Sequence, residues 1–328
     1  MQIARIKNEG IEWQTQQTGA SKPAATEVTL QIAYAGVNRA DVMQVAGAYP
    51  PPAGASDIPG LECSAVVMAV GQQVTNLKVG QRVAALLSAG GYAESVTVDA
   101  RQVLPLPDNW TLQEGAGWLE TFATAHLNVF QLANLKDGEV VFSYAGASGV
   151  GSSLIQLCRE QKNPIYAAVG SEEKRQFCQQ LGATGVFNRH QQDVHTQLKD
   201  IGGLDVILNP VAGDSVSRDQ EILQTDGRLI VIGLLGGRHG QVDFGRLLMK
   251  RQRLLGSTLR SLSAAKKGQI LTALWQQFGP AFAARRVVPV IDKVYSADTI
   301  NDALDYLKED QSQGKVVVKI ADVADCDS

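Results

Sequence analysis

The sequence has few cysteines and no cysteine pair of the kind that holds a metal. Its 328 residues include 4 cysteines, which are scattered with no C-x-x-C spacing, so neither a zinc ribbon nor a disulfide framework is indicated. An excess of charge of either sign is also missing, because the formal net charge is only -3. This near balance argues against a nucleic-acid partner or a membrane surface bound through a basic patch.

Long apolar runs and a targeting segment are absent as well. No stretch is long enough to span a bilayer, and no early segment combines a basic start with a long apolar run. We therefore expect no membrane partner and a cytoplasmic location. A chain of 328 residues is long enough for about two domains and a sizeable core.

The most informative stretch, residues 140–151, predicts a buried strand, a tight turn and then a helix. The small residues after the strand allow the backbone to approach a pyrophosphate, whose charge the amides at the helix start can hold. The glycine pattern is a variant of G-x-G-x-x-G, which on its own also fits an ordinary strand, turn and helix. The predicted nucleotide contacts are Gly146, Ala147, Ser148, Gly149 and Val150.

The end of the next predicted strand discriminates between the two nicotinamide cofactors. Residues 165–169 form that strand, which ends at Gly170 and Ser171, with Lys174 and Arg175 one turn into the following helix. An NAD site has an acidic residue at the strand end, whereas a hydroxyl group with nearby cations suits a 2′-phosphate. We interpret the two glutamates after Ser171 as first-turn residues favoured by the helix dipole. The sequence therefore favours NADPH over NADH.

Further strands alternate with helical segments, as a parallel sheet with right-handed crossovers requires. They are predicted over residues 185–188, 204–209, 227–233 and 254–259. In such sheets the ligand lies beyond the carboxyl ends of the strands. The residues that follow these strands are therefore candidate cofactor contacts, although each also fits a loop without a ligand: Asn209, Gly233, Leu234, Leu235, Thr258, Leu259 and Arg260.

The first 123 residues have a different pattern, with short strands at roughly ten-residue spacing that suggest a small barrel. After the dinucleotide fold, a long helix over residues 264–282 and a last strand over residues 315–320 should return to this first domain. The predicted layout is a discontinuous catalytic domain of residues 1–123 and 265–328. A dinucleotide-binding domain of residues 124–264 is inserted into it.

Motifs at residues 38–41, 60–62, 78–83, 145–151 and 314–317 occur in order along nearly the whole chain. They resemble the signatures of the zinc-free quinone oxidoreductases, the zeta-crystallin-like branch of the medium-chain dehydrogenase/reductase superfamily. The resemblance implies an α/β fold, with a Rossmann doubly wound parallel sheet inserted into a GroES-like β-barrel domain. It also implies NADPH as the reductant, a quinone or another electron-poor carbonyl compound as the substrate, and a homodimer.

The resemblance assigns roles to individual residues. It puts Asn38 and Thr124 near the nicotinamide, Tyr49 at the substrate side, and Lys174 at the 2′-phosphate. Arg189 departs from the pattern, because many relatives have a tyrosine there, against the adenosine phosphate. The arginine either replaces that contact with a charged one or points to solvent.

Zinc is not expected, because the ligands that it prefers are missing. A zinc alcohol dehydrogenase of this superfamily needs sulfur and imidazole ligands around an open position. Here Asn38 lies in the first loop, and Leu61 stands where the ligand histidine would be.

Hydride transfer from NADPH to a quinone needs few catalytic side chains, because the cofactor carries the chemistry. The developing oxyanion needs a hydrogen-bond donor, for which Tyr49 and Asn38 are the candidates, and the second proton can come from water. The sequence shows no obvious buried general acid. Two alternatives are a reductase of enone or alkenal double bonds and a non-catalytic NADPH-binding protein, crystallin-like or regulatory.

Overall fold

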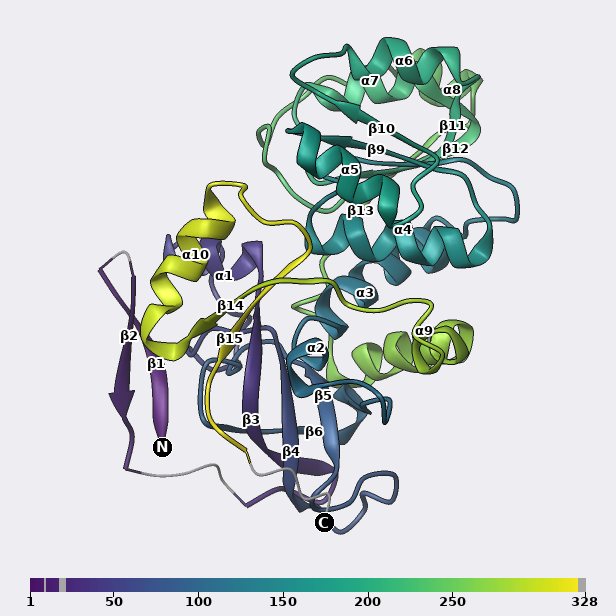
Figure 1. The fold of residues 1–328 in the computed structure, drawn as a ribbon. Helices are drawn as coiled ribbons and strands as arrows, with labels where there is room; N and C mark the ends of the chain where they lie inside the picture. The colour runs from purple at the N-terminus through teal and green to yellow at the C-terminus, as the bar shows by residue number, and fades with distance from the viewer. Residues whose placement is uncertain (9, 18–21, 324–328) are drawn as a thin grey trace. The chain divides into compact units, whose positions relative to one another are not determined.

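The computed structural model describes residues 1–8, 10–17 and 22–323. The chain divides into two compact units. Unit 1 comprises Met1–Ala123 and Leu259–Ser328, and unit 2 comprises Thr124–Thr258 (Figure 1). The sequence analysis placed the second boundary at residue 265, which lies in the first turn of α9 (Ala264–Ala283), a helix of unit 1.

Unit 2 contains a six-stranded parallel sheet. Its strands are β8 (Val141–Ser143), β9 (Ile165–Val169), β10 (Gly185–Asn188), β11 (Leu204–Asn209), β12 (Leu223–Val231) and β13 (Arg253–Gly256). They lie in the order β10-β9-β8-β11-β12-β13, so the first strand in the chain is in the middle of the sheet. This is the doubly wound order of dinucleotide-binding sheets, whose ligand site lies where the order reverses, here between β8 and β11.

Helices connect these strands and cover their apolar side chains. They are α4 (Gly149–Gln161), α5 (Glu172–Gln180), α6 (Val194–Asp200), α7 (Ser215–Ile222) and α8 (Phe244–Met249). Phe142, Ile207 and Leu229 are buried in one hydrophobic cluster with residues of α6 and α7. Because the strands of such a sheet are buried on both faces, they are short, nearly continuous apolar runs. For this reason β9, β10 and β11 begin and end where the sequence analysis placed them.

Unit 1 is built on a seven-stranded sheet. Its strands are β3 (Glu27–Val37), β4 (Glu62–Val70), β5 (Arg82–Leu86), β6 (Ser95–Asp99), β7 (Val103–Pro105), β14 (Ile291–Ser296) and β15 (Lys315–Lys319). The order is β14-β15-β3-β4-β5-β7, and β6 also pairs with β3. Because β15 pairs with β3, both ends of the chain contribute to one sheet (Figure 1).

An additional hairpin, β1 (Gln2–Lys7) and β2 (Gly10–Thr15), belongs to unit 1 and was not predicted. Its strands are short and carry few apolar residues.

The segment that returns to unit 1 after unit 2 is held by an aromatic cluster, in which Phe282 of α9 lies edge-on to Trp110, Trp118 and Phe122. All four side chains are buried.

A buried ion pair crosses three neighbouring strands of the sheet in unit 1. Lys315 on β15 and Glu62 on β4 are both buried, and Lys315 Nζ lies 2.7 Å from Glu62 Oε1. The strand between them, β3, ends at Val37, whose carbonyl oxygen accepts a further hydrogen bond of 3.0 Å from Lys315 Nζ. Each charge depends on the other, because an unpaired ion in this position would be costly to bury.

We predict that Lys315→Ala strongly destabilises the protein, because it leaves Glu62 charged, buried and unpaired. The expected loss of unfolding free energy is about 3–5 kcal/mol, measured by urea denaturation. Lys319→Ala is the matched control, since Lys319 lies on the same strand and its partner Asp322 is exposed. It should change the unfolding midpoint little, and equal effects of the two substitutions would contradict this account of the ion pair.

Candidate active site

The loop between β8 and α4 is close-packed and presents the start of a helix. A Cβ atom at Gly151 would lie 2.4 Å from the carbonyl oxygen of Ala145, and one at Gly146 would lie 2.6 Å from Cβ of Ala167. Ala145 itself has a left-handed backbone, with φ of 51°. Only glycine therefore fits at Gly146 and Gly151, and the backbone of the loop passes directly over the helix.

Ser148 caps α4, because its Oγ accepts a hydrogen bond of 3.1 Å from the backbone N–H of Gly151. Gly146 and Ala147 are buried, whereas Ser148, Gly149 and Val150 are partly exposed. The first amides of a helix lack acceptors within the helix and favour an anion. Of the five predicted nucleotide contacts, two therefore shape the loop and three lie at its surface.

Four of the predicted contacts gather at the carboxyl end of β9. Ser171 caps α5 and accepts a hydrogen bond of 3.2 Å from the backbone N–H of Lys174, a largely buried residue. A Cβ atom at Gly170 would lie 2.7 Å from Nη2 of Arg189, so the guanidinium group of Arg189 lies against this glycine. The end of β9 thus combines two residues with small side chains, Gly170 and Ser171, with a lysine and an arginine.

The other charged groups at the start of α5 have partners within the same helix start. Arg175 donates two hydrogen bonds to Glu172, of 2.8 Å from Nε and 2.6 Å from Nη2. A backbone hydrogen bond, and next a hydrogen bond from the side chain of Ser171, lower the pKa of the Glu173 carboxylate. Both glutamates lie in the first turn of the helix.

Asn209 was predicted to contact the cofactor, but its side chain is completely buried within unit 2. Its Oδ1 accepts hydrogen bonds from the backbone N–H groups of Val211 and Ala212, at 2.7 and 2.8 Å. Its Nδ2 donates to Asp219 Oδ2 at 2.6 Å and to Ser215 Oγ at 2.8 Å. The amide therefore shapes the loop after β11, which sequence reasoning could not show.

Asp219 extends this buried network to the end of β8. Tyr144 donates its hydroxyl hydrogen to Asp219 Oδ1 at 2.5 Å, and His195 Nε2 lies 3.1 Å from each of these two oxygens. Burial raises the pKa of Tyr144, and Asp219 raises it further, so the phenol stays a donor. The network ties together the loops that follow β8 and β11.

The remaining predicted cofactor contacts are spread over several positions. Leu234 and Leu235 are exposed beyond Gly233, and the backbone N–H of Leu235 donates to the carbonyl oxygen of Pro210 at 3.1 Å. Thr258 is exposed at the end of unit 2, whereas Leu259 is buried. The carbonyl oxygen of Thr124, on α3 (Leu119–Ala125), accepts a hydrogen bond of 2.7 Å from Asn128 Nδ2.

Arg260 was predicted to contact the cofactor, but its guanidinium group is engaged within unit 1. It donates to the carbonyl oxygens of Ser88 and Tyr49, at 2.9 and 3.1 Å, and to Gln44 Oε1 at 2.5 Å. The guanidinium carbon lies 5.2 Å from the centroid of the Tyr49 ring, a cation–π distance. Arg260 therefore holds the loop that carries Tyr49.

Asn38 and Tyr49, the two predicted oxyanion donors, have different surroundings. Asn38 Oδ1 accepts a hydrogen bond of 2.7 Å from Lys315 Nζ. Its Nδ2 donates hydrogen bonds to Glu62 Oε1 at 3.2 Å and to the carbonyl oxygen of Gly36 at 3.4 Å. In contrast, the hydroxyl of Tyr49 has no hydrogen-bond partner within the described part of the chain. Tyr49 is half-buried and is the better placed of the two to donate to a ligand.

Asp41 fixes the backbone around Asn38. Its carboxylate accepts hydrogen bonds from the backbone N–H groups of Asn38 and Gly60, at 2.9 and 3.1 Å, and from the hydroxyl of Tyr92 at 3.0 Å. Complete burial raises the pKa of Asp41 to about 6, against the effect of these donors. Asp41 thereby joins α1 (Arg39–Val45) to the loop that precedes β4.

Sequence reasoning missed four charged residues that line this part of unit 1: Glu62, Glu120, Lys267 and Lys315. Lys267 is buried on α9, and its Nζ donates to the carbonyl oxygen of Leu87 at 3.0 Å and to Ser88 Oγ at 2.6 Å. Glu120 Oε2 is also buried. The available signal was a charged residue within an apolar stretch, as in the sequence around Glu120 and Lys315.

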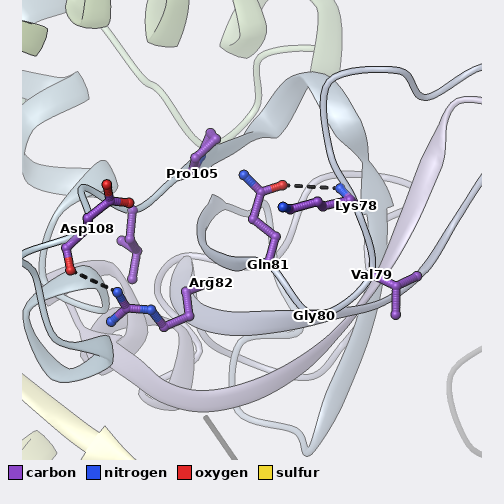
Figure 2. Close-up of a pocket in the computed structure, with 8 residues that line it drawn as sticks. Lys78, Val79, Gly80, Gln81, Arg82, Pro105 and Asp108 are labelled. Atoms are coloured by element: carbon purple, nitrogen blue, oxygen red, sulfur yellow. Dashed lines mark hydrogen bonds between the residues drawn. The ribbon is translucent and has the colours of Figure 1, made fainter. Parts of the chain in front are cut away.

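A surface hollow of about 580 Å³ lies elsewhere in unit 1 (Figure 2). Its arginine, Arg82, donates to the carbonyl oxygens of Trp110 and Asp108, at 2.8 and 2.9 Å. Gln81 accepts a hydrogen bond of 3.1 Å from the backbone N–H of Lys78 (Figure 2). None of the predicted site residues lines this hollow.

Known proteins match the chain in both units. A family model described as the alcohol dehydrogenase GroES-like domain matches residues 24–108, and one described as zinc-binding dehydrogenase matches residues 149–276. The human synaptic vesicle membrane protein VAT-1 homolog is 26% identical over 326 residues, which cover 94% of this chain and 82% of that protein.

Two solved structures show the same fold over almost the full length. The quinone oxidoreductase from Thermus thermophilus, also solved in complex with NADPH, is 28% identical with a TM-score of 0.80, covering 97% of this chain and 100% of that one. CurK enoyl reductase is 25% identical with a TM-score of 0.83, covering 97% and 98%. The predicted α/β fold class, with a GroES-like domain and a parallel Rossmann sheet, is confirmed. The chain belongs to the medium-chain dehydrogenase/reductase superfamily of NAD(P)-dependent oxidoreductases.

Proposed function

We propose that this protein is an NADPH-dependent oxidoreductase that reduces quinones without zinc. The observation that carries the proposal is the surface at the end of β9, where Gly170 lies beside Arg189 and Ser171 caps the helix turn that contains Lys174. Two cations and a hydroxyl group suit a 2′-phosphate, which only NADPH carries. The similarity to a quinone oxidoreductase solved with NADPH supports the same assignment.

The residues of unit 2 fit a dinucleotide. The pyrophosphate would lie on the helix start at Ser148, Gly149 and Val150, with its negative charge near the positive end of α4. Lys174 and Arg189 would hold the 2′-phosphate. When bound, NADPH supplies a hydride to the substrate.

In unit 1, the proposed catalytic residue is Tyr49. Its hydroxyl group donates a hydrogen bond to the oxygen on which negative charge develops as a quinone is reduced. Burial raises the pKa of Tyr49. The charge of the nearby Arg260 lowers this pKa, and the charge of Glu120 raises it. The net shift is upward, so the phenol keeps its proton. We also propose that Asn38, whose side chain is held by Lys315 and Glu62, lies near the nicotinamide.

Zinc independence is supported by the side chains present. Position 61 is a leucine, although one matching family model takes its description from zinc-binding dehydrogenases. Across residues 1–8, 10–17 and 22–323, no three His, Cys, Asp or Glu side chains are grouped so that they could hold a metal ion.

A second candidate function is the reduction of enones or alkenals at the double bond. The similarity to CurK enoyl reductase favours it, and hydride and one proton are needed in both reactions. Its product, a saturated carbonyl compound, distinguishes it from a quinone reductase. A non-catalytic NADPH-binding protein would form neither product.

We also propose that the protein is a homodimer. In unit 2, β13 is an edge strand, and edge strands can pair with a second chain. Exposed apolar side chains occur on the neighbouring helix α8, at Phe244, Leu248 and Met249. Light scattering of the purified protein tests this, and a monomer mass would contradict it.

We further propose a cytoplasmic location. In the described part of the chain no helix is long and apolar enough to cross a membrane. Fractionation of cells that express the tagged chain tests the location, and recovery in a membrane or vesicle fraction would contradict it.

The function is tested by NADPH oxidation with a panel of quinones and enones, followed by product analysis. We expect quinones to be reduced to hydroquinones, and we expect the rate to survive treatment with a metal chelator. A saturated ketone as the main product would favour the alternative function. Activity that depends on added zinc would overturn the proposal, as would no oxidation with any acceptor.

Replacement of Lys174 tests the cofactor. Lys174→Ala should raise the Kd for NADPH by roughly tenfold or more while changing the Kd for NADH little, because only NADPH offers a phosphate to the ammonium group. Fluorescence titration of both cofactors measures this. Lys162→Ala, which removes a lysine at the carboxyl end of α4, is the control. Equal losses for both cofactors would refute the role of Lys174.

Tyr49→Phe tests the proposed oxyanion donor. The ring and its contact with Arg260 stay, but the donor is lost, so kcat should fall by roughly three- to thirtyfold. The Kd for NADPH and the melting temperature should not change. Steady-state kinetics with one good quinone measure the effect, and an unchanged kcat would remove Tyr49 from the catalytic residues.

A further inference from the structure

One partly exposed carboxyl group in unit 1 has a buried oxygen that lacks the contacts a carboxylate needs. Glu120 lies at the start of α3, and its backbone N–H donates to Glu62 Oε2 at 3.0 Å. Its own Oε2 is buried, and no described residue offers that atom a hydrogen bond. Burying an ionised carboxylate without hydrogen bonds is strongly unfavourable, so such a group takes up a proton instead.

The nearby lysines donate no hydrogen bond to Glu120 Oε2. Lys315 Nζ donates to Val37, Asn38 and Glu62. Lys267 donates to the carbonyl oxygen of Leu87 and to Ser88 Oγ, which are neutral acceptors.

The charged neighbours of Glu120 come from four elements. They are the anions Glu62 of β4 and Asp41 of α1 and the cations Lys267 of α9 and Lys315 of β15. The pKa of Glu120 is raised to about 8, and burial is the largest cause. The negative charges of Glu62 and Asp41 also raise this pKa, whereas the positive charges of Lys267 and Lys315 lower it. The raised pKa therefore favours the neutral form of Glu120 near neutral pH.

Glu120 also lies within electrostatic range of Tyr49, since its charge would raise the pKa of that phenol. An ionised glutamate there would oppose the negative charge that develops on a substrate oxygen. A neutral carboxyl group has the opposite effect, because it can donate a hydrogen bond or a proton to that oxygen. The charge state of Glu120 thus matters for the reaction proposed above.

We propose that Glu120 is the general acid of the reductase site, holding one proton at neutral pH and giving it to the substrate oxygen after hydride transfer. This rests on the proposed function. Hydride adds two electrons and one proton to the quinone while the nicotinamide is oxidised, and the product is a hydroquinone monoanion. Its O⁻ then bonds to the proton of Glu120 as the carboxyl O–H bond breaks. The resulting carboxylate regains a proton from water.

The pH dependence of kcat in Glu120→Gln tests this role. The wild-type rate should fall as the pH rises through about 8, because the acid loses its proton. The variant should be roughly a hundredfold slower, with no such fall. Glu120→Asp restores an acid and should restore a pH-dependent limb. Glu12→Gln, at an exposed ion pair with Lys7 on the hairpin, should behave as wild type.

A measurement without substrate separates this proposal from the proposed function. The folded-state pKa of Glu120 is raised from its ordinary value of 4.5, so the stability that this group contributes is fully present below that value. That stability is lost as the pH rises towards 8. Urea titrations at several pH values measure the unfolding free energy of the wild type and of Glu120→Gln. The difference, wild type minus variant, should therefore decrease as the pH rises from about 4.5 to about 8.

The outcomes are distinct. Two results together support the general acid: loss of the kinetic limb in Glu120→Gln, and a stability difference between the wild type and Glu120→Gln that decreases as the pH rises towards 8. A stability difference that does not vary with pH, or a kinetic limb that survives in Glu120→Gln, would overturn it. If the wild type reduces no acceptor, the proposed function fails, while the stability titration still reports whether Glu120 holds a proton.

Discussion

The buried charge of Lys315 is the constraint on which unit 1 depends. A lysine surrounded by strands must satisfy all its N–H groups, and Lys315 does so with Glu62, the end of β3 and the side chain of Asn38. The same glutamate accepts a hydrogen bond from the first turn of α3, where Glu120 lies. One ion pair therefore joins β15, near the end of the chain, to β4. It also sets the positions of two polar side chains at the candidate site.

Unit 2 solves a related problem with a hydrogen-bond network. Asp219 is buried, and its carboxylate is satisfied by Tyr144, Asn209 and His195. These residues follow or face the two strands at which the order of the sheet reverses, where doubly wound sheets bind their ligands. The loops proposed to meet the cofactor are therefore held by buried polar contacts, while Ser148 and Gly149 are partly exposed.

The parts of this structure that could be predicted from sequence are local. Close-packed glycines in the loop before α4, and the apolar runs of β9, β10 and β11, follow from a few neighbouring residues. The missed features depend on contacts between distant residues. Arg260 bonds to partners 211 and 216 positions away, and Glu120 is held by a residue 58 positions away. A sequence shows a charge in an apolar stretch, but not which group pairs with it. The partners of the Asn209 amide are only 2 to 10 positions away, but an asparagine at the end of a strand does not show by itself which groups it will bind.

The central claim is that the residues at the end of β9 select NADPH and that Tyr49 meets the substrate oxygen. A crystal structure of the protein with NADPH and a slowly reduced quinone analogue tests both parts at once. The account predicts the 2′-phosphate within hydrogen-bond distance of Lys174 Nζ, and a quinone oxygen within hydrogen-bond distance of the Tyr49 hydroxyl. A 2′-phosphate that faces away from Lys174, or a quinone oxygen bound away from Tyr49, would contradict it.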